Sequence, residues 1–257
     1  MKIRGYVALV LILVSFVPLD LVQRLILGPW VRLVPRHRIG VLTRWQRFMA
    51  WWVMAFVSKV GGADLPDPLH IPGEDGTLVL MNHQSVLDIP LVVSSIRGSY
   101  PRIVTRKRYL RWIPLISHMV RLYQYPVVDP SAKANPSESK KMLAGIRDAA
   151  RTTDVPFALF PEGTRTKDGE IGPFRTTGLK LVLRQRPWTV YLLVGDGYWE
   201  RAKLKHFLSG MHDIRGTLRL LGPFVWDDPR GDSEAFIEEM RAAMVAELHR
   251  MRDGVEE

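Results

Sequence analysis

Cysteine is absent from the 257 residues of the chain. This absence excludes disulfide bonds, cysteine-ligated metal sites and a thiol nucleophile. It also fits a protein of the cytoplasmic side, where structural disulfides are rare. Four of the seven histidines lack metal-ligand spacing to any partner, namely His118, His206, His212 and His249. We therefore expect no metal site and no bound cofactor.

Acidic residues are fewer than basic residues: the chain has 26 Asp and Glu and 36 Lys and Arg, which gives a formal charge of +10. Such a balance favours a polyanionic partner, either nucleic acid or an anionic lipid surface. The chain has no zinc-finger pattern and no ribonucleoprotein-type aromatic strand. Its basic residues are spread, with one concentration at residues 102–111. We expect an anionic membrane surface, and not nucleic acid, as the partner.

A long apolar run is also missing, since a full transmembrane helix needs about 20 consecutive apolar residues. The stretch from Tyr6 to Leu19 is apolar apart from Ser15, but Pro18 and Asp20 interrupt it. Its charged start and apolar centre resemble a signal peptide. However, bulky residues follow it where a small-residue cleavage site would lie.

A second apolar segment, Thr43 to Val60, carries four aromatic residues at helical spacing: Trp45, Phe48, Trp52 and Phe56. Such a stripe is most often the buried face of a core helix. Tryptophans beside arginines also suit the headgroup region of a bilayer. Because two apolar segments precede any strand pattern, we favour a membrane-associated helical pair over residues 1–60. We expect an interfacial or re-entrant anchor and not a full span.

The rest of the chain alternates between strand and helix patterns after a linker rich in Gly, Pro and Asp at residues 61–76. The expected strands are 77–81, 102–105, 125–128, 155–160, 189–194 and 217–221. The expected helices are 89–96, 114–122, 137–151, 177–184 and 233–251. This alternation predicts an α/β domain over residues 77–257, with a sheet covered by helices.

The spacing His-x-x-x-x-Asp occurs twice, once in the linker (His70 and Asp75) and once directly after an expected strand (His83 and Asp88). Residues five apart on one helix do not share a face, so the second pair can meet only across a turn. Pro90 favours such a turn, because proline is not tolerated deep inside a helix. The alternative is that Asp88 simply caps the following helix. On this segment alone, the two interpretations are about equally supported.

A second strand end decides between them. The stretch "VPFALFPEGTR", residues 155–165, is an apolar strand that ends in Glu162, Gly163, Thr164 and Arg165. If both strands belong to one parallel sheet, their carboxyl ends share the edge where α/β proteins place their sites. A carboxylate, an arginine and a glycine turn able to receive an anion would then face the His–Asp pair. The alternative is an ordinary surface turn.

Together, "NHQSVLD" and "FPEGTR" resemble the first and third motifs of the glycerolipid acyltransferases, in particular the 1-acylglycerol-3-phosphate acyltransferases. The resemblance covers roughly residues 77–194. It implies a mixed, largely parallel sheet flanked by helices. The paired N-terminal segments resemble the membrane-docking element of bacterial members, which implies the cytoplasmic face of a bacterial inner membrane.

The resemblance implies transfer of an acyl group from acyl-CoA or acyl-carrier protein to a lysophospholipid hydroxyl, most directly that of lysophosphatidic acid. His83 would be the general base, because an imidazole titrates near neutrality. Asp88 would orient the ring. The substrate supplies the hydroxyl, and the chain lacks the Gly-x-Ser-x-Gly pattern of a serine nucleophile. Glu162 would order Arg165 or contact the acceptor, and Gly163 would approach the thioester.

The chain departs from the family in its second motif, which usually ends in Asp-Arg, whereas here Asp129 precedes Pro130. That arginine is associated with the acceptor's phosphate, so we expect the contact to move to Lys107, Arg121 or Arg165. This departure concerns the acceptor's head group and leaves the acyl-transfer chemistry unchanged. Two rival functions remain, an acyltransferase for another lysolipid and an inert lipid-binding scaffold with the same fold.

Overall fold

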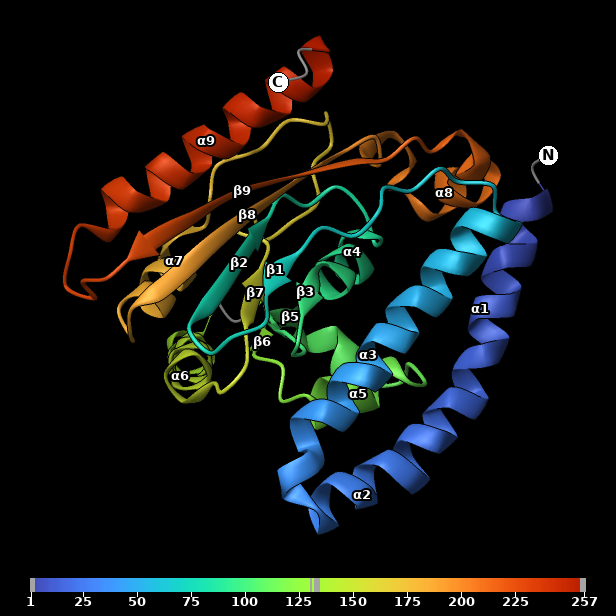
Figure 1. Cartoon of the computed structure of the whole chain (residues 1–257), viewed down its shortest axis with the longest axis horizontal. Coiled ribbons are helices and arrows are strands. Elements are labelled where there is room, and N and C mark those ends of the chain that lie inside the picture. Colours follow the sequence, from blue (N-terminus) through green and yellow to red (C-terminus); the bar gives the residue numbers. More distant parts are fainter. Residues whose placement is uncertain (1–2, 130, 132–134, 255–257) are drawn as a thin grey trace.

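The computed structural model describes residues 3–129, 131 and 135–254. At its centre lies a five-stranded sheet with the strand order β4-β7-β2-β8-β9 (Figure 1). The strands are β2 (Thr77–Met81), β4 (Arg102–Ile103), β7 (Phe157–Leu159), β8 (Trp188–Asp196) and β9 (Thr217–Trp226). β4, β7, β2 and β8 are parallel, and β9 pairs with β8 in the antiparallel direction. The expected mixed, largely parallel sheet is confirmed.

Helices connect the strands and cover the sheet (Figure 1). They are α4 (Asp88–Ser95), α5 (Ile116–Leu122), α6 (Pro136–Thr152), α7 (Thr176–Leu183), α8 (Leu204–Ser209) and α9 (Ser233–Asp253). Two small parallel pairs lie beside the main sheet: β1 (Ile71–Pro72) with β3 (Ile96–Arg97), and β5 (Thr105–Arg106) with β6 (Val127–Val128). Short 3₁₀ turns cover Pro35–His37, Lys107–Leu110, Trp199–Arg201 and Met211–Asp213.

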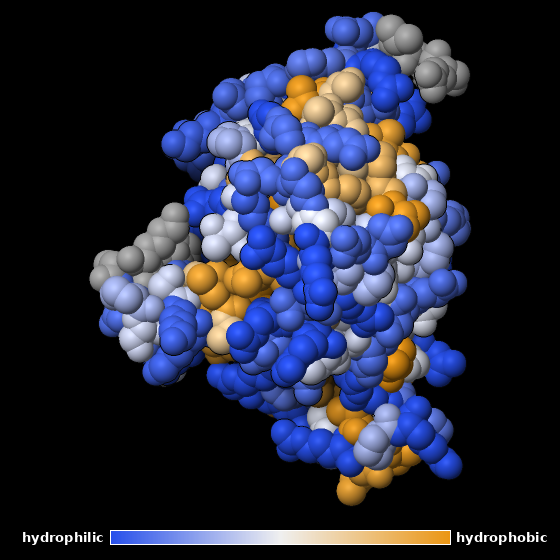
Figure 2. Space-filling view, turned by 90° about the vertical axis from the view of Figure 1, so that its left-hand side faces the viewer, coloured by the Kyte–Doolittle hydropathy of each residue, from blue (hydrophilic) through white to orange (hydrophobic). Residues whose placement is uncertain are grey.

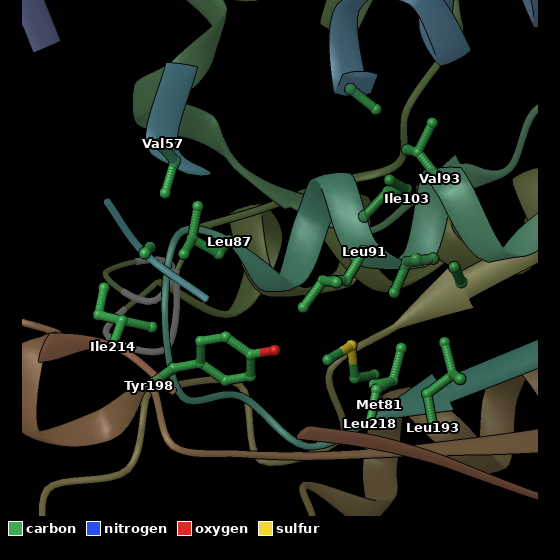
Figure 3. Packing of buried hydrophobic residues seen from close by; sticks show 14 of the residues in the cluster. Val57, Met81, Leu87, Leu91, Val93, Ile103, Leu193, Tyr198, Ile214 and Leu218 are labelled. Atoms are coloured by element: carbon green, nitrogen blue, oxygen red, sulfur yellow. The ribbon is translucent and has the colours of Figure 1, made fainter. Parts of the chain in front are cut away.

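The alternation of side chains along β2 divides the core into two layers. Leu78 and Leu80 join one buried cluster, to which α6, α7 and α9 contribute. Val79 and Met81 join the other, with α4 and the N-terminal helices. Figure 3 shows the second layer, with α4 lying over the sheet. Since both faces of β2 are buried, the strand can be apolar at every position and still be held rigidly.

The N-terminal segment is one continuous helix of 31 residues, Ile3–Leu33, which is long and apolar enough to cross a membrane. It consists of α1 (Ile3–Val22), a π-helical turn (Gln23–Leu27) and α2 (Gly28–Leu33). The expectation that Pro18 interrupts this segment is wrong, because Pro18 lies inside α1. A proline removes only one helical hydrogen bond, and apolar helices absorb that loss by local adjustment.

The second apolar segment forms α3 (Arg38–Ala55), which a π-helical turn extends to Val60. α3 packs beside α1, where Trp52 Nε1 donates to Ser15 Oγ at 3.0 Å. Arg4 Nε closes the far end with a 2.9 Å hydrogen bond to the Val60 carbonyl. The two segments therefore form a helical pair (Figure 1).

This helical pair shares a core with the α/β domain. Ala8, Ile12 and Val57 belong to the same buried cluster as Met81. Gly5 allows α1 to approach α8 closely, since a Cβ there would lie 2.1 Å from the Leu208 carbonyl oxygen. The close packing of α1 therefore depends on a residue without a side chain.

The predicted linker is also packed against the body, because Ala63 and Ile71 are buried in the shared cluster. Within it, Asp64 N donates to the Ile214 carbonyl at 3.0 Å. The division at residues 60 and 76 stays a prediction.

The outer surface of α1 and α2 is apolar and exposed, with Leu13, Val14, Leu25 and Leu33 each more than half exposed. Most of the exposed large apolar residues lie on these N-terminal helices. Figure 2 shows the face on the left-hand side in Figure 1, where hydrophilic residues predominate and apolar residues gather in a few patches.

Candidate active site

His83 and Asp88 are in contact at the carboxyl end of β2, with 2.7 Å between Nδ1 and Oδ2. β2 ends at Met81, so His83 follows a strand that is buried along its whole length. The Asp88 side chain is fully buried, whereas that of His83 is 19% exposed. A carboxylate held in the interior thus orients an imidazole that reaches the surface.

The turn between the two residues holds the carboxylate in place. Asp88 Oδ2 accepts the backbone N–H groups of Gln84 and Ser85 at 2.7 and 2.8 Å. These amides precede α4, whereas a capping carboxylate binds amides within the first turn of its own helix. The N-cap position is Leu87, and it has no side-chain cap. The interpretation of Asp88 as a simple helix cap is therefore wrong.

The second ring nitrogen of His83, Nε2, has no protein partner within the described residues. The ring stacks on Phe160 at the end of β7, with centroids 4.3 Å apart and planes inclined by 24°. Because Nδ1 faces a carboxylate, the ring proton belongs on Nδ1 and the lone pair stays on Nε2. The geometry thus provides a base at Nε2.

Glu162 joins the two strand ends. Its side chain is buried, and Oε1 accepts the His83 backbone N–H at 2.9 Å while Oε2 accepts that of Gly172 at 3.1 Å. Burial raises the pKa of Glu162, although these two hydrogen bonds oppose the shift. Since each oxygen holds a backbone amide, Glu162 neither binds the Arg165 side chain nor extends toward solvent.

The turn after β7 is stabilised by arginines that the motif alone does not identify. Arg175 Nε donates to the Glu162 carbonyl at 3.0 Å, and Arg106 Nη2 donates to the Gly163 carbonyl at 3.0 Å. Gly163 has φ +67°, and a Cβ there would lie 2.5 Å from Arg175 Cδ, so both the backbone and the packing require glycine. The Gly163 N–H donates to the Phe160 carbonyl at 3.0 Å within the turn.

The other residues of the turn point elsewhere. Thr164 is exposed, and Arg165 Nη1 donates to the Ala202 carbonyl at 3.0 Å. Thr166 N donates to the His83 carbonyl at 2.8 Å and provides a second link between the two strand ends. The turn and the His–Asp pair therefore form one rigid unit.

The two predicted phosphate contacts on the basic stretch have other neighbours. Lys107 Nζ lies 3.1 Å from Asp129 Oδ2, and hydrogen bonds from Ser131 and Lys107 lower the pKa of Asp129. Pro130 lies outside the described residues. Arg121 donates to the Leu110 carbonyl at 2.7 Å and lines an open pocket of about 520 Å³ between α5, β6 and α6. None of these contacts joins Lys107 or Arg121 to His83.

Sequence reasoning missed Arg106 as a site residue, although a signal was available. Side chains alternate along a strand, and Arg106 ends β5 directly before Lys107. Arg106 thus belongs to the strand and Lys107 to the 3₁₀ turn that follows, and the two neighbouring side chains have different partners, Gly163 and Asp129. Figure 1 shows β5 and β6 beside the main sheet.

Sequence reasoning also missed Asn82 and Gln84, which join the end of β2 to β8. Asn82 forms two 2.8 Å hydrogen bonds with the backbone of Gly195 on β8. Gln84 Nε2 donates to Asp196 Oδ1 at 2.9 Å, and Arg252 from α9 binds the same carboxylate at 2.9 and 3.1 Å. Burial opposes ionisation of Asp196, but hydrogen bonds from Arg252 and Gln84 outweigh it and lower its pKa.

The fold and site together define an α/β protein with a His–Asp pair at the carboxyl edge of a largely parallel sheet. A sequence model of the acyltransferase family matches residues 64–192, just over half of the chain. The match spans β2, β7 and the residues that the structure brings together between them. The chain belongs to the acyltransferase family.

Two curated relatives carry the name 1-acyl-sn-glycerol-3-phosphate acyltransferase. That of Cocos nucifera is 26% identical over 171 residues, which cover 64% of this chain and 52% of that protein. The chloroplastic BAT2 of Brassica napus is 28% identical over 172 residues, which cover 66% of this chain and 47% of that protein. The chain spans about half the length of the curated relatives it matches.

A solved structure, that of the 1-acyl-sn-glycerophosphate acyltransferase PlsC from Thermotoga maritima, superimposes with a TM-score of 0.53. The superposition covers 93% of this chain and 100% of that chain at 16% sequence identity. At this identity the likeness shows a shared fold alone.

Proposed function

We propose that the protein transfers a fatty acyl group from acyl-CoA or acyl-carrier protein to the hydroxyl of lysophosphatidic acid, which yields phosphatidic acid. The observation that carries this proposal is the 2.7 Å contact between His83 and the buried Asp88, which leaves Nε2 as a base. The names of the curated relatives support lysophosphatidic acid as the acceptor.

The chemistry needs one base and one orienting carboxylate. His83 Nε2 takes the hydroxyl proton while the hydroxyl oxygen attacks the carbonyl carbon of the thioester. Asp88 stabilises the imidazolium that forms, as the carboxylate does in a Ser-His-Asp triad. When the tetrahedral intermediate collapses, the C–S bond breaks and the thiolate takes the proton from Nε2. General acid–base catalysis of this kind contributes roughly 10²–10⁴ in rate.

Arg106 and Arg175 are the cations best placed for the acceptor's phosphate. Each uses one N–H on a carbonyl of the turn that holds the backbone of His83. A guanidinium has five N–H donors, so both retain donors that match a phosphate. We therefore assign the phosphate contact to Arg106 and Arg175. Arg165, whose Nη1 donates to the Ala202 carbonyl, is a weaker candidate. Lys107 and Arg121, which the sequence favours, are the weaker candidates.

The exposed side of α1 and α2 provides a membrane contact for a lipid substrate. Val10 is 57% exposed and Val14 is 64% exposed, while Ala8 and Ile12 on the same helix are buried against the body. A helix with one apolar side open to solvent suits the interface of a bilayer. With the formal charge of +10, we assign the protein to an anionic membrane, at the cytoplasmic face of a bacterial inner membrane.

The membrane contact is testable without disrupting the core. We expect the double variant Val10→Glu/Val14→Glu to be released from membranes, because both side chains are exposed and the buried residues stay unchanged. Sedimentation of washed membranes measures the effect. A variant that still pellets after a high-salt wash contradicts the assignment.

The activity is tested by incubating the purified full chain with labelled oleoyl-CoA and a panel of lysolipids. We expect labelled phosphatidic acid from lysophosphatidic acid, and loss of the product in His83→Ala. His70→Ala is the matched control, because it removes the histidine of the other His-x-x-x-x-Asp copy.

The same panel separates the rival functions. If the acyl group is transferred to a lysolipid with another head group, and not to lysophosphatidic acid, the proposed acceptor is wrong and the proposed chemistry stands. Transfer to no acceptor, or equal transfer by His83→Ala, would reject the enzyme and leave a lipid-binding scaffold.

A further inference from the structure

Trp112 occupies a position that a tryptophan rarely takes in a folded protein. Its side chain is 94% exposed, and its backbone has φ +68°. A bulky residue in this left-handed region of the backbone is strained. Neither burial nor backbone preference explains a tryptophan here, so the side chain has no evident role in stabilising the fold.

The neighbours of Trp112 are basic and exposed. Arg111 precedes it directly, and the exposed Arg108 packs its guanidinium over Tyr109 at 4.9 Å from the ring centroid. Pro114 then follows and is also exposed. An exposed tryptophan that follows two exposed arginines matches the headgroup layer of an anionic bilayer, where indole rings and guanidinium groups are both favoured.

The segment after Trp112 is attached to the N-terminal helix. Gln23, which is fully buried, donates from Nε2 to the Leu115 carbonyl at 3.1 Å and lies at the same distance from His118 Nδ1. Its Oε1 accepts the Trp45 indole N–H at 3.0 Å. One glutamine therefore joins the N-terminal helix, α3 and the segment that carries Trp112.

The apolar surface of the N-terminal helix continues at this junction. Directly after Gln23, Leu25 is 70% exposed and Ile26 is 58% exposed, and Trp30 is 48% exposed one turn later. In Figure 1, α5 lies beside α3, on the side of the molecule that carries α1 and α2. Trp112 thus lies three residues before Leu115, where the α/β domain contacts the N-terminal helix.

We propose that the loop Arg108–Trp112 is a second membrane contact, in which Trp112 inserts into the headgroup layer of an anionic bilayer while Arg108 and Arg111 bind lipid phosphates. This proposal rests on the proposed function, in which the chain works at a membrane. Two contacts, one on the helix and one on the domain, fix the tilt of the domain, which a single helix would leave free. The charge of the loop favours a lipid surface over a protein partner.

The absence of cysteine permits a direct test, because Trp112→Cys creates a single site for an environment-sensitive dye. The labelled full-length protein is mixed with vesicles of phosphatidylcholine, with and without phosphatidylglycerol. We expect a blue-shifted and brighter emission on the anionic vesicles, quenched by lipids that carry a quencher near the headgroup. The matched control is Val225→Cys, which is 69% exposed and lies on β9, the edge strand at the opposite end of the sheet from β4.

The proposal is overturned if the dye at position 112 keeps the emission of a solvent-exposed dye, as expected for position 225, even when the protein floats with the vesicles. Emission that shifts equally at both positions also overturns it, because it indicates non-specific adsorption. The dye measurement does not use catalysis, so a failure of the acyltransferase assay leaves this result interpretable. Conversely, full activity with a solvent-exposed dye rejects only the loop contact.

A second measurement separates lipid binding from a structural role. We expect Trp112→Gly to leave the thermal midpoint unchanged or to raise it, because glycine relieves the left-handed backbone. Leu115→Gly is the matched control, with φ +64° but a side chain that is 1% exposed, and we expect it to lower the midpoint by roughly 5 °C or more. A comparable fall in Trp112→Gly would show that the tryptophan serves the fold and would overturn the proposal.

Discussion

The chain contains the same spacing of histidine and aspartate at opposite ends of one strand, and only one copy forms a pair. His83 and Asp88 follow β2 and lie 2.7 Å apart. His70 and Asp75 precede β2, and Asp75 instead binds Arg186 at 2.7 Å with its side chain 53% exposed. The structural context of the two copies therefore differs, although their spacing is identical.

The difference lies in what comes before and after each histidine. His83 follows β2, a strand that is buried at every position. In the turn after His83, the backbone amides of Gln84 and Ser85 donate to Asp88. His70 comes from an irregular segment and enters the two-residue strand β1. A rigid strand end followed by a tight turn therefore makes a site, and spacing alone does not.

Removing the histidine from each copy gives the largest contrast. We expect His83→Ala to lower kcat/KM for acyl transfer by roughly 10²–10⁴, because the base at Nε2 is lost. We expect His70→Ala to stay near wild type. Initial rates with labelled oleoyl-CoA and lysophosphatidic acid measure both, with thermal midpoints to confirm folding. Equal losses in the two variants would remove the distinction between the copies.

The aspartates provide the next contrast. We expect Asp88→Asn to lower kcat by up to about 10⁴, since an amide cannot stabilise the imidazolium and favours the wrong ring tautomer. Asp75→Asn removes only an exposed ion pair, and should change the free energy of unfolding by about 1 kcal/mol or less with no effect on kcat. A rate for Asp88→Asn close to wild type would rule out an orienting carboxylate.

A third variant tests whether the sheet edge around His83 and Asp88 binds the acceptor. We expect Arg106→Gln to raise KM for lysophosphatidic acid by roughly 10–100-fold, because a charge-assisted hydrogen bond to phosphate is lost. KM for oleoyl-CoA should stay unchanged. The neighbouring Lys107→Gln is the matched control, since Lys107 is paired with Asp129. The assignment of the phosphate contact fails if Lys107→Gln has the larger effect.

The smallest expected effect is a dependence of stability on pH at Glu162. Its pKa is raised above the ordinary value of 4.5 by burial. A raised carboxyl pKa contributes stability below the unfolded pKa, and this contribution is lost as pH rises through the folded pKa. We expect the thermal midpoint of wild type, relative to that of Glu162→Gln, to fall as pH rises from about 4 to about 7. A flat difference would show that Glu162 has no raised pKa.

Local sequence patterns predicted much of the sheet and the geometry of the His83–Asp88 pair. The strand at residues 77–81 is observed with the same bounds, because a short apolar run between polar turns admits few other structures. The need for a turn between His83 and Asp88 followed from helical geometry, and Pro90 lies in the first turn of α4 as expected. These features depend on neighbours in the sequence.

What local pattern could not predict depends on distant partners. Glu162 holds the backbone of His83, 79 residues away, so its role is visible only once the two strands are side by side. Arg106 and Gly163 meet for the same reason, at a separation of 57 residues. The N-terminal helix continues through the exposed Pro18, which removes a single helical hydrogen bond, so a proline in the sequence did not locate the end of the helix.

The central claim, that His83 and Asp88 act as one catalytic unit, is tested most directly by a double-mutant cycle on kcat/KM. Residues that act together are not additive, so we predict that His83→Ala/Asp88→Asn is no slower than His83→Ala alone. Losses that multiply, with the double variant slower than His83→Ala by the full factor of Asp88→Asn, would show that the two residues act independently and would contradict the account.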